Sequence, residues 1–471
     1  MNFRRFFGIS FAIVIPFWLV GCATTSPVGS FGDVDRLVSG RLGQSVVWTR
    51  SEAASGRASA SVEALVGQPL TAETAVRVAL RDNRRLQGEF EQIGISQAEF
   101  AQASRLPNLR IAGSWRFPDR PPSAGDVEYS VVGNLLDLLT LPARKALAGR
   151  DLEAAKLRVA DEVLRLASDT RAAFYRLQAQ LQMARELGVI VQAGDAAADF
   201  ARRQHQAGNI DGLALREQEA SATQGHLDLI EVRARASELR EDLNRLMALP
   251  DDRLGWTVAD ALPELPAAEP DLRNLETIAL RQRLDLAVAR GRVEALAAAL
   301  RLKTRTRYIP GLSVGVDSER TPDGQRVTGP TLDLELPLFD QGQPALAKLA
   351  AEYRQARDRV QDLETAVRSQ VRKARADVMA FREAAELSGR QLLPLRTGIL
   401  QQTLLQYNAM QKSTYDLLLA KEHEEAAVEE HVALLRRYWI ARVALDRAIG
   451  GRLTLVGAEP APAPAGMHSR S

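Results

Sequence analysis

Cysteine, histidine and excess charge of either sign are scarce in this 471-residue chain, and each shortage excludes a class of protein. The only cysteine is Cys22, so neither an intramolecular disulfide nor a cysteine cluster for zinc is possible. The 61 Lys and Arg balance 59 Asp and Glu, and removing the first 21 residues, which hold Arg4 and Arg5 and no acid, leaves 59 against 59. A neutral chain has no basic face for nucleic acid.

Motifs for catalysis are also missing. The sequence has no P-loop, no G-x-S-x-G and no H-E-x-x-H, so we expect no enzyme and no catalytic, cofactor-binding or metal-binding residues. Four histidines lie in helical segments, and we expect them to be solvated side chains on helix surfaces: His205, His226, His423 and His431.

The N-terminus has the pattern of a signal peptide. Arg4 and Arg5 precede an apolar stretch from Phe6 to Val20, which is shorter than the roughly 20 residues of a transmembrane helix. It ends in Leu-Val-Gly before Cys22, which resembles the bacterial lipobox. We therefore predict a signal peptide over 1–21 and lipidation of Cys22; the alternative is an ordinary secretory signal with a chance cysteine. Ala23, where lipoproteins retained in the inner membrane usually have Asp, favours the outer membrane.

The remaining chain is one unit written twice, with an offset of about 200 residues. We divide it into a lipidated extended leader (22–69), a first repeat (70–250), a second repeat (271–452) and a disordered tail (453–471). Three pairs of segments carry the repeat: Ala79–Arg81 with Ala279–Arg281, Leu106–Leu109 with Ile309–Leu312, and Leu243–Arg245 with Leu445–Arg447.

Each copy predicts a helix, two strands, a long helix, a tight turn and a returning helix. In the first copy we expect a helix over 71–105, ended by Pro107, and strands over 109–115 and 127–137. The segment 330–338 alternates Leu with polar residues or Pro, as a one-sided amphipathic strand does. The long helices have coiled-coil spacing, clearest in Leu346, Leu349, Tyr353, Ala356, Val360, Leu363 and Val367. Pro394 interrupts the second one.

Both long helices end in turns with capping residues. The first turn spans 207–212, where Gly208 and Asn209 tolerate left-handed backbone and Asp211 can cap the returning helix. The second spans 407–412, followed by Ser413 and Asp416 at the spacing of a capping box.

These motifs in this order resemble the TolC-type outer membrane factors over residues 70–450. The segment Leu336–Gly342 resembles the strand-to-helix junction of that family, and Gly208–Leu215 and Tyr407–Ala420 resemble its hairpins. The resemblance implies a mainly α fold with a small β part. It implies a homotrimer with a 12-stranded barrel in the outer membrane and a helical tunnel through the periplasm, which docks at its tips with a periplasmic adaptor of an inner-membrane pump.

The resemblance also assigns site residues. The expected tip contacts for the adaptor are Gly208, Asn209, Asp211, Leu213, Met410, Ser413 and Leu417. Asp416 is the candidate gate of the tunnel entrance and Asp211 the second, although a role as helix caps explains both residues more simply and is compatible with a gate. Two departures stand out: the first copy has Leu139–Pro142 at its junction, and Met410 replaces a hairpin glycine, which predicts a wider second turn.

Three functions fit this pattern. The first is a passive efflux duct for small molecules or metal ions, and the second is a duct for type I protein secretion. The third is a periplasmic coiled-coil structural lipoprotein, which has no use for paired strands in both copies. The aromatic residues Trp115, Phe117 and Tyr129 near the first strands suit either a membrane-interface belt or ordinary strand packing. The strands favour a duct, and the lipobox favours efflux.

Overall fold

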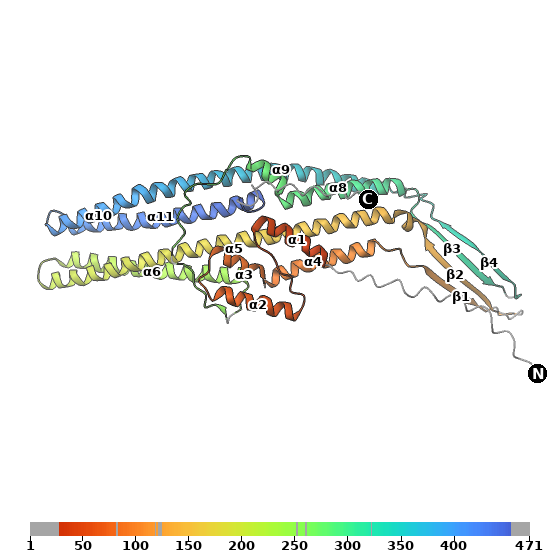
Figure 1. The fold of residues 1–471 in the computed structure, drawn as a ribbon, viewed down its shortest axis with the longest axis horizontal. Helices are drawn as coiled ribbons and strands as arrows, with labels where there is room; N and C mark the ends of the chain where they lie inside the picture. The colour runs from red at the N-terminus through yellow and green to blue at the C-terminus, as the bar shows by residue number, and fades with distance from the viewer. Residues whose placement is uncertain are drawn as a thin grey trace, which may run out of the picture.

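The chain forms a long rod with a sheet at one end and two helical hairpins at the other (Figure 1). The computed structural model describes residues 28–81, 83–117, 119–120, 125–250, 253–259, 261–321 and 323–453. The predicted signal peptide, Cys22 and all but the first residue of the expected tail lie outside these ranges.

The two copies have the same order of helices and strands, apart from the break at η2. The first copy consists of α3 (Ala72–Arg81), α4 (Arg84–Ala103), β1 (Arg110–Arg116), β2 (Asp126–Asn134), α5 (Leu135–Gln206) and α6 (Gly212–Met247). The second consists of α7 (Leu275–Gln282), α8 (Leu284–Thr306), β3 (Leu312–Arg320), β4 (Arg326–Leu334), α9 (Gln343–Leu387), the π turn η2 (Ser388–Leu392), α10 (Leu393–Asn408) and α11 (Thr414–Ile449).

Two predicted boundaries are wrong for local reasons. The helix expected over 71–105 is broken, because the Asn83 side chain accepts a hydrogen bond from the Leu86 backbone N–H (3.1 Å) and starts α4. The strand expected over 127–137 ends at Asn134, which caps α5 through the Asp137 N–H at 3.0 Å. The strand therefore passes into the helix without a loop, and Pro142 lies inside α5.

The leader was predicted to be extended, but its described part is helical. It forms α1 (Val28–Leu42) and α2 (Glu52–Val66), and α1 packs on α5 and α4 through the buried Val34 and Val38. The Arg41 guanidinium donates to the Gln282 carbonyl of the α7 end and, at 3.1 Å, to the Gly450 carbonyl after α11. The leader thus joins the second repeat to the first.

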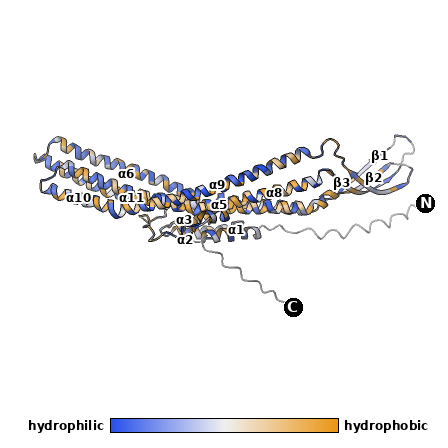
Figure 2. Cartoon of the chain, turned by 90° about the horizontal axis from the view of Figure 1, so that it is seen from above, coloured by the Kyte–Doolittle hydropathy of each residue, from blue (hydrophilic) through white to orange (hydrophobic). Residues whose placement is uncertain are grey.

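Most of the buried core lies near the middle of the rod, where α3 and α7 pack against the long helices. The first copy contributes Phe174, Leu177 and Leu243, and the segment after α6 contributes Trp256. The second copy contributes Val367, Val371, Tyr438 and Leu445. Figure 2 shows hydrophobic and hydrophilic residues interspersed along the long helices. Among the described helices, none combines the length and the apolar composition that crossing a membrane requires.

The four strands form one antiparallel sheet in the order β1-β2-β3-β4, so β2 and β3 join the two copies. Directly paired residues point to the same side of a sheet. One side, here called the apolar face, consists of Ile111, Gly113, Trp115, Val127, Tyr129, Val131, Gly133, Leu312, Val314, Val316, Ser318, Arg320, Arg326, Thr328, Pro330, Leu332 and Leu334. The opposite side, the polar face, carries Arg110, Arg116, Asp126, Glu128, Asp317, Glu319 and Asp333.

Candidate functional site

The first hairpin, α5 and α6, turns at Gly208. Gly208 has a φ of +74°, and the Asn209 N–H donates to the Gln204 carbonyl at 2.9 Å, which satisfies a free carbonyl at the end of α5. Asp211 accepts a hydrogen bond from the Ala214 N–H at 2.8 Å, so its predicted capping role is confirmed. The turn is therefore fixed by its own backbone and leaves the Leu213 side chain 66% exposed.

The second hairpin, α10 and α11, turns in the same way, and the prediction of a wider turn is wrong. Met410 has a φ of +57° and takes the place of Gly208. The Gln411 N–H donates to the Gln406 carbonyl at 2.8 Å, the same bond as in the first turn. The Met410 side chain is 95% exposed, so a large apolar group projects from this tip.

Asp416 is part of a complete capping box. Its backbone N–H donates to the Ser413 hydroxyl at 3.2 Å, and its carboxylate accepts the Ser413 N–H at 3.0 Å. The hydrogen bonds from Ser413, and then the Lys412 ammonium at 3.5 Å, hold the pKa of Asp416 below its usual value. The carboxylate is therefore ionised at neutral pH, and its role as a cap is confirmed. Its role as a gate stays a prediction.

A groove of about 430 Å³ lies between the two hairpins near their tips. Its apolar lining comes from both hairpins, and we call it the tip groove: Phe200, Ile210, Leu404, Tyr407, Leu417 and Leu418. Of the predicted tip residues, only Leu417 lines it. Phe200 and Leu404 were not predicted, because each sits a full helical turn or more from its loop and reads in the sequence as an ordinary core position.

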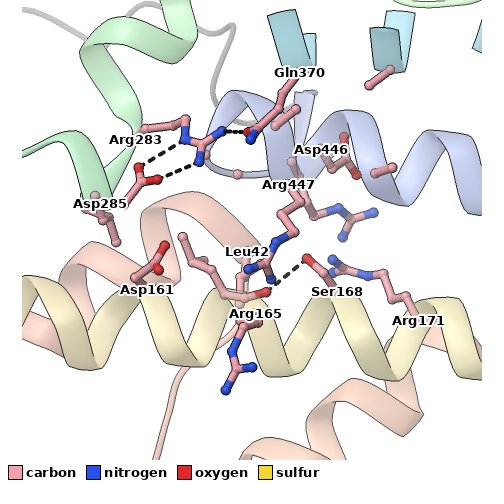
Figure 3. Close-up of a pocket in the computed structure, with 18 of the residues that line it drawn as sticks. Leu42, Asp161, Arg165, Ser168, Arg171, Arg283, Asp285, Gln370, Asp446 and Arg447 are labelled. Atoms are coloured by element: carbon pink, nitrogen blue, oxygen red, sulfur yellow. Dashed lines mark hydrogen bonds and ion pairs between the residues drawn. The ribbon is translucent and has the colours of Figure 1, made fainter. Parts of the chain in front are cut away.

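A second, strongly charged pocket of about 510 Å³ lies at the middle of the rod, between helices of both copies (Figure 3). Arg283 binds Asp285 at 2.5 Å and the Gln370 side chain at 2.5 Å. Asp161 lies on the opposite side; burial, and then the neighbouring Asp285 charge, raise its pKa. No motif in the sequence indicates this pocket, because its residues come from α1, α5, α8, α9 and α11, from the junction of α7 and α8, and from the segment after α11.

The histidines do not converge on a site. Within the described ranges, no three His, Cys, Asp or Glu side chains are placed to hold a metal ion. His226 bonds Asp195 at 2.9 Å on the first hairpin. The prediction of a solvated surface is wrong for His431: its ring packs against Gly389 of η2, and its Nδ1 atom is buried without a hydrogen-bond partner among the described residues.

Comparison with known proteins identifies the fold but not a sequence family. No family model and no curated protein matches the sequence. The Campylobacter jejuni CmeC outer membrane channel matches with a TM-score of 0.72 at 16% identity, over 81% of this chain and 85% of that chain. The Vibrio cholerae outer membrane protein VceC matches with a TM-score of 0.66 at 16% identity, over 86% and 98%.

A third matching structure is that of an outer membrane channel in its open state. The Neisseria gonorrhoeae MtrE outer membrane channel has a TM-score of 0.62 at 15% identity and covers 83% of this chain and 89% of its own. These proteins are named as outer membrane proteins or channels, and none is named as an enzyme. The fold implied by the resemblance to TolC-type outer membrane factors is thereby confirmed: this chain has the fold of the outer membrane channels.

Proposed function

We propose that the chain is one subunit of a trimeric outer membrane channel, the passive exit duct of a tripartite efflux system for small molecules or metal ions. The observation that carries this proposal is the sheet at the end of the rod, with one apolar and one polar face. An apolar face that includes Ile111 at 77% and Leu332 at 69% exposure suits lipid, and the charged polar face suits a water-filled lumen.

The two edges of the sheet explain why more than one chain is needed. In the described sheet, β1 and β4 each pair on one side only. Unpaired backbone N–H and C=O groups are too costly in lipid, so the edges have to pair with neighbouring copies. Three copies of four strands give the 12-stranded barrel implied by the resemblance. The hairpins then extend into the periplasm, and a lipid on Cys22 adds a second attachment to the outer membrane.

The tips and the tip groove are the proposed docking site for the helical hairpins of a periplasmic adaptor, which connects the duct to an inner-membrane pump. Exposed apolar side chains at both turns, Leu213 and Met410, fit this role, and so does the groove that Leu417 lines. Gly208, Asn209, Asp211 and Ser413 shape the turns that present them. Selection of the transported substrate is left to the pump.

A substitution of Asp416 can test the proposed gate separately from its role as a helix cap. Asp416→Asn keeps an oxygen that can accept the Ser413 N–H but removes the negative charge, so helix stability stays within about 0.5 kcal/mol of the original. If three Asp416 carboxylates constrict the entrance, this variant passes more of a small solute than the original channel in a liposome-swelling assay. Unchanged permeability with an unchanged unfolding midpoint leaves Asp416 as a cap only. Asp211→Asn, on the first hairpin, tests the second candidate gate in the same assay.

The test of the whole proposal is the mass of the detergent-extracted particle, measured by light scattering on protein from the outer membrane fraction. We expect the protein mass of three chains and single-channel conductance after reconstitution in planar bilayers. A monomer in mild detergent, or full release from the membrane by cleavage of the lipid anchor alone, contradicts the proposal and supports a periplasmic lipoprotein.

A further inference from the structure

The apolar face of the sheet is layered along the strands, and its last layer has an unusual composition. Paired residues across the four strands form rows at equal heights. Three rows are aliphatic over most of their width: Leu312 with Leu334; Gly133, Val314 and Leu332; and Ile111, Val131, Val316 and Pro330. The next row is Gly113, Tyr129, Ser318 and Thr328, and the last is Trp115, Val127, Arg320 and Arg326.

This order matches the passage from the apolar core of a membrane to its polar surface. Aliphatic residues come first, followed by the hydroxyl groups of Ser318 and Thr328, which bond each other at 2.9 Å. The aromatic residues lie in the outer two rows, where the Trp115 and Tyr129 rings meet edge to face at 5.8 Å. Trp and Tyr favour the membrane–water interface, so the last row, which Trp115 shares with the two arginines, is at the height of the headgroups.

Arg320 and Arg326 lie directly opposite each other on adjacent strands, and both are exposed. Like charges in direct cross-strand positions are destabilising. An anion between two guanidinium groups offsets this repulsion through charge-assisted hydrogen bonds. Among the described residues neither guanidinium makes an ion pair or a hydrogen bond. Glu319, next to Arg320 in the chain, lies on the polar face. Asp323 instead holds the turn by accepting from the Thr321 hydroxyl and from the Gln325 N–H at 3.4 Å.

The row that contains Arg320 and Arg326 lies at the end of the sheet that is farthest from the helices. Figure 1 shows that the turn between β3 and β4 is the end farthest from the helices. Arg320 is eight residues beyond Leu312, or about 27 Å along an extended strand, close to the roughly 25 Å apolar band of outer membrane barrels. If the hairpins extend into the periplasm, as the proposed function requires, this row faces the outer leaflet.

We propose that Arg320 and Arg326 form a binding site for the phosphate group of an anionic lipid headgroup in the outer leaflet. Two guanidinium groups on adjacent strands provide a fork of N–H donors that suits phosphate oxygens. The apolar rows below hold the acyl chains of the same lipid, and Trp115 shares the headgroup layer. A bound lipid of this kind removes the repulsion between the two arginines and seals the barrel surface where β3 meets β4.

The experiment uses the full-length protein purified from the outer membrane and exchanged into mixed micelles with equal amounts of phosphatidylglycerol and phosphatidylcholine. Native mass spectrometry then counts the lipids retained per particle. We expect roughly a tenfold preference for phosphatidylglycerol, because two surface cations act on its net negative charge, whereas in phosphatidylcholine the choline group cancels the phosphate charge. Arg320→Gln/Arg326→Gln loses this preference, and Arg354→Gln/Arg359→Gln, an equal charge change at exposed positions of α9, keeps it.

Each other outcome overturns the proposal in a different way. Equal lipid preference in the Arg320→Gln/Arg326→Gln variant places lipid recognition elsewhere. If inorganic phosphate at the same concentration as the lipid abolishes the preference, the arginines bind free phosphate and not a headgroup. A trimer that retains both lipids equally refutes only this site. A monomer that leaves the membrane without detergent refutes the proposed function, and this inference with it.

Discussion

The two hairpins arise from the same repeated unit, but their packing differs. The first is continuous, since α5 runs without interruption for 72 residues. Its half nearest the tip has a hydrophobic cluster of its own, in which Leu187 and Val191 of α5 pack against Leu229 of α6. In the second hairpin, η2 separates α9 from α10, and α10 buries none of its side chains. The first hairpin is therefore held by side-chain packing along most of its length, and the second is not.

The contact between Gly389 and His431 explains where the second hairpin changes. A Cβ atom on Gly389 would lie 2.7 Å from the His431 ring, so only glycine permits the helices to approach this closely. The extra residue of a π turn rotates the helix face that follows, which turns the apolar residues of α10 outward. Leu395, Ile399 and Leu405 are 64%, 47% and 69% exposed.

This difference indicates that stability is graded along the rod. Segments with few buried apolar contacts open at lower free energy than the core. We expect the second hairpin beyond η2 to open first, while the first hairpin stays closed as a rigid support. The apolar stripe on α10 is also available to a neighbouring copy in the proposed trimer.

The largest effect on stability is expected from removing a side chain of the hydrophobic cluster in the first hairpin, which has no counterpart in α10. Leu187→Ala leaves a cavity in the cluster of the first hairpin and lowers the free energy of unfolding by about 2–4 kcal/mol. Leu395→Ala removes an exposed side chain of α10 and costs about 0.5 kcal/mol or less. Guanidinium unfolding of the full-length protein measures both. If both variants lose the same free energy of unfolding, Leu395 is buried against a partner copy. The difference in packing between the hairpins then exists only in the isolated chain.

A second effect, of about 1–3 kcal/mol, is expected where the two helices are closest. Gly389→Ala places a methyl group against the His431 ring and forces η2 away from α11. Gly398→Ala is the matched control on α10, where a Cβ meets nothing within 4 Å, and it stabilises the helix by about 0.5–1 kcal/mol. Thermal unfolding gives both signs. If Gly389→Ala is neutral, the close approach of the helices does not hold the second hairpin.

A smaller effect compares the two turns. Met410→Gly relieves a left-handed conformation that costs a side chain about 1 kcal/mol, and Gly208→Ala introduces the same cost at the first tip. The midpoint of unfolding rises in the first variant and falls in the second. Adaptor binding adds a second measurement: if the Met410 side chain contacts the adaptor, Met410→Gly weakens binding although it stabilises the turn. A variant that binds as before removes Met410 from the docking surface.

The sequence was informative where one local rule decides the structure. Turn chemistry located both tips, because Asp211 and the pair Ser413 and Asp416 have capping roles that need no tertiary contact. Alternation of apolar residues located the strands, although Asn134 ended β2 earlier than its apolar pattern indicated. The order of these elements was sufficient to predict the fold.

Features that depend on distant contacts were not predicted. The leader helix α1 is stabilised by Val34 and Val38 packing on α5 and by Arg41 reaching carbonyls of the second copy, and its Gly- and Ser-rich sequence has no strong helical pattern of its own. The tip groove needs Phe200 and Leu404 to face each other across two hairpins. The setting of His431 depends on Gly389, which lies 42 residues earlier in the chain.

The smallest expected effect concerns His431, which makes the difference in stability between the two hairpins depend on pH. Burial lowers the pKa of His431 from its ordinary value of 6.5, so the opened hairpin takes up a proton more readily than the packed one. The stability of the second hairpin therefore falls as the pH drops through and below 6.5, while it is fully present at higher pH. Hydrogen exchange of α10 amides between about pH 7.5 and about pH 5.5, corrected for intrinsic rates, measures the change. His431→Gln abolishes it and His423→Gln, at an exposed position of the same helix, does not. If His431→Gln keeps the full pH dependence, other groups control the opening, and the contact at Gly389 is only a packing contact.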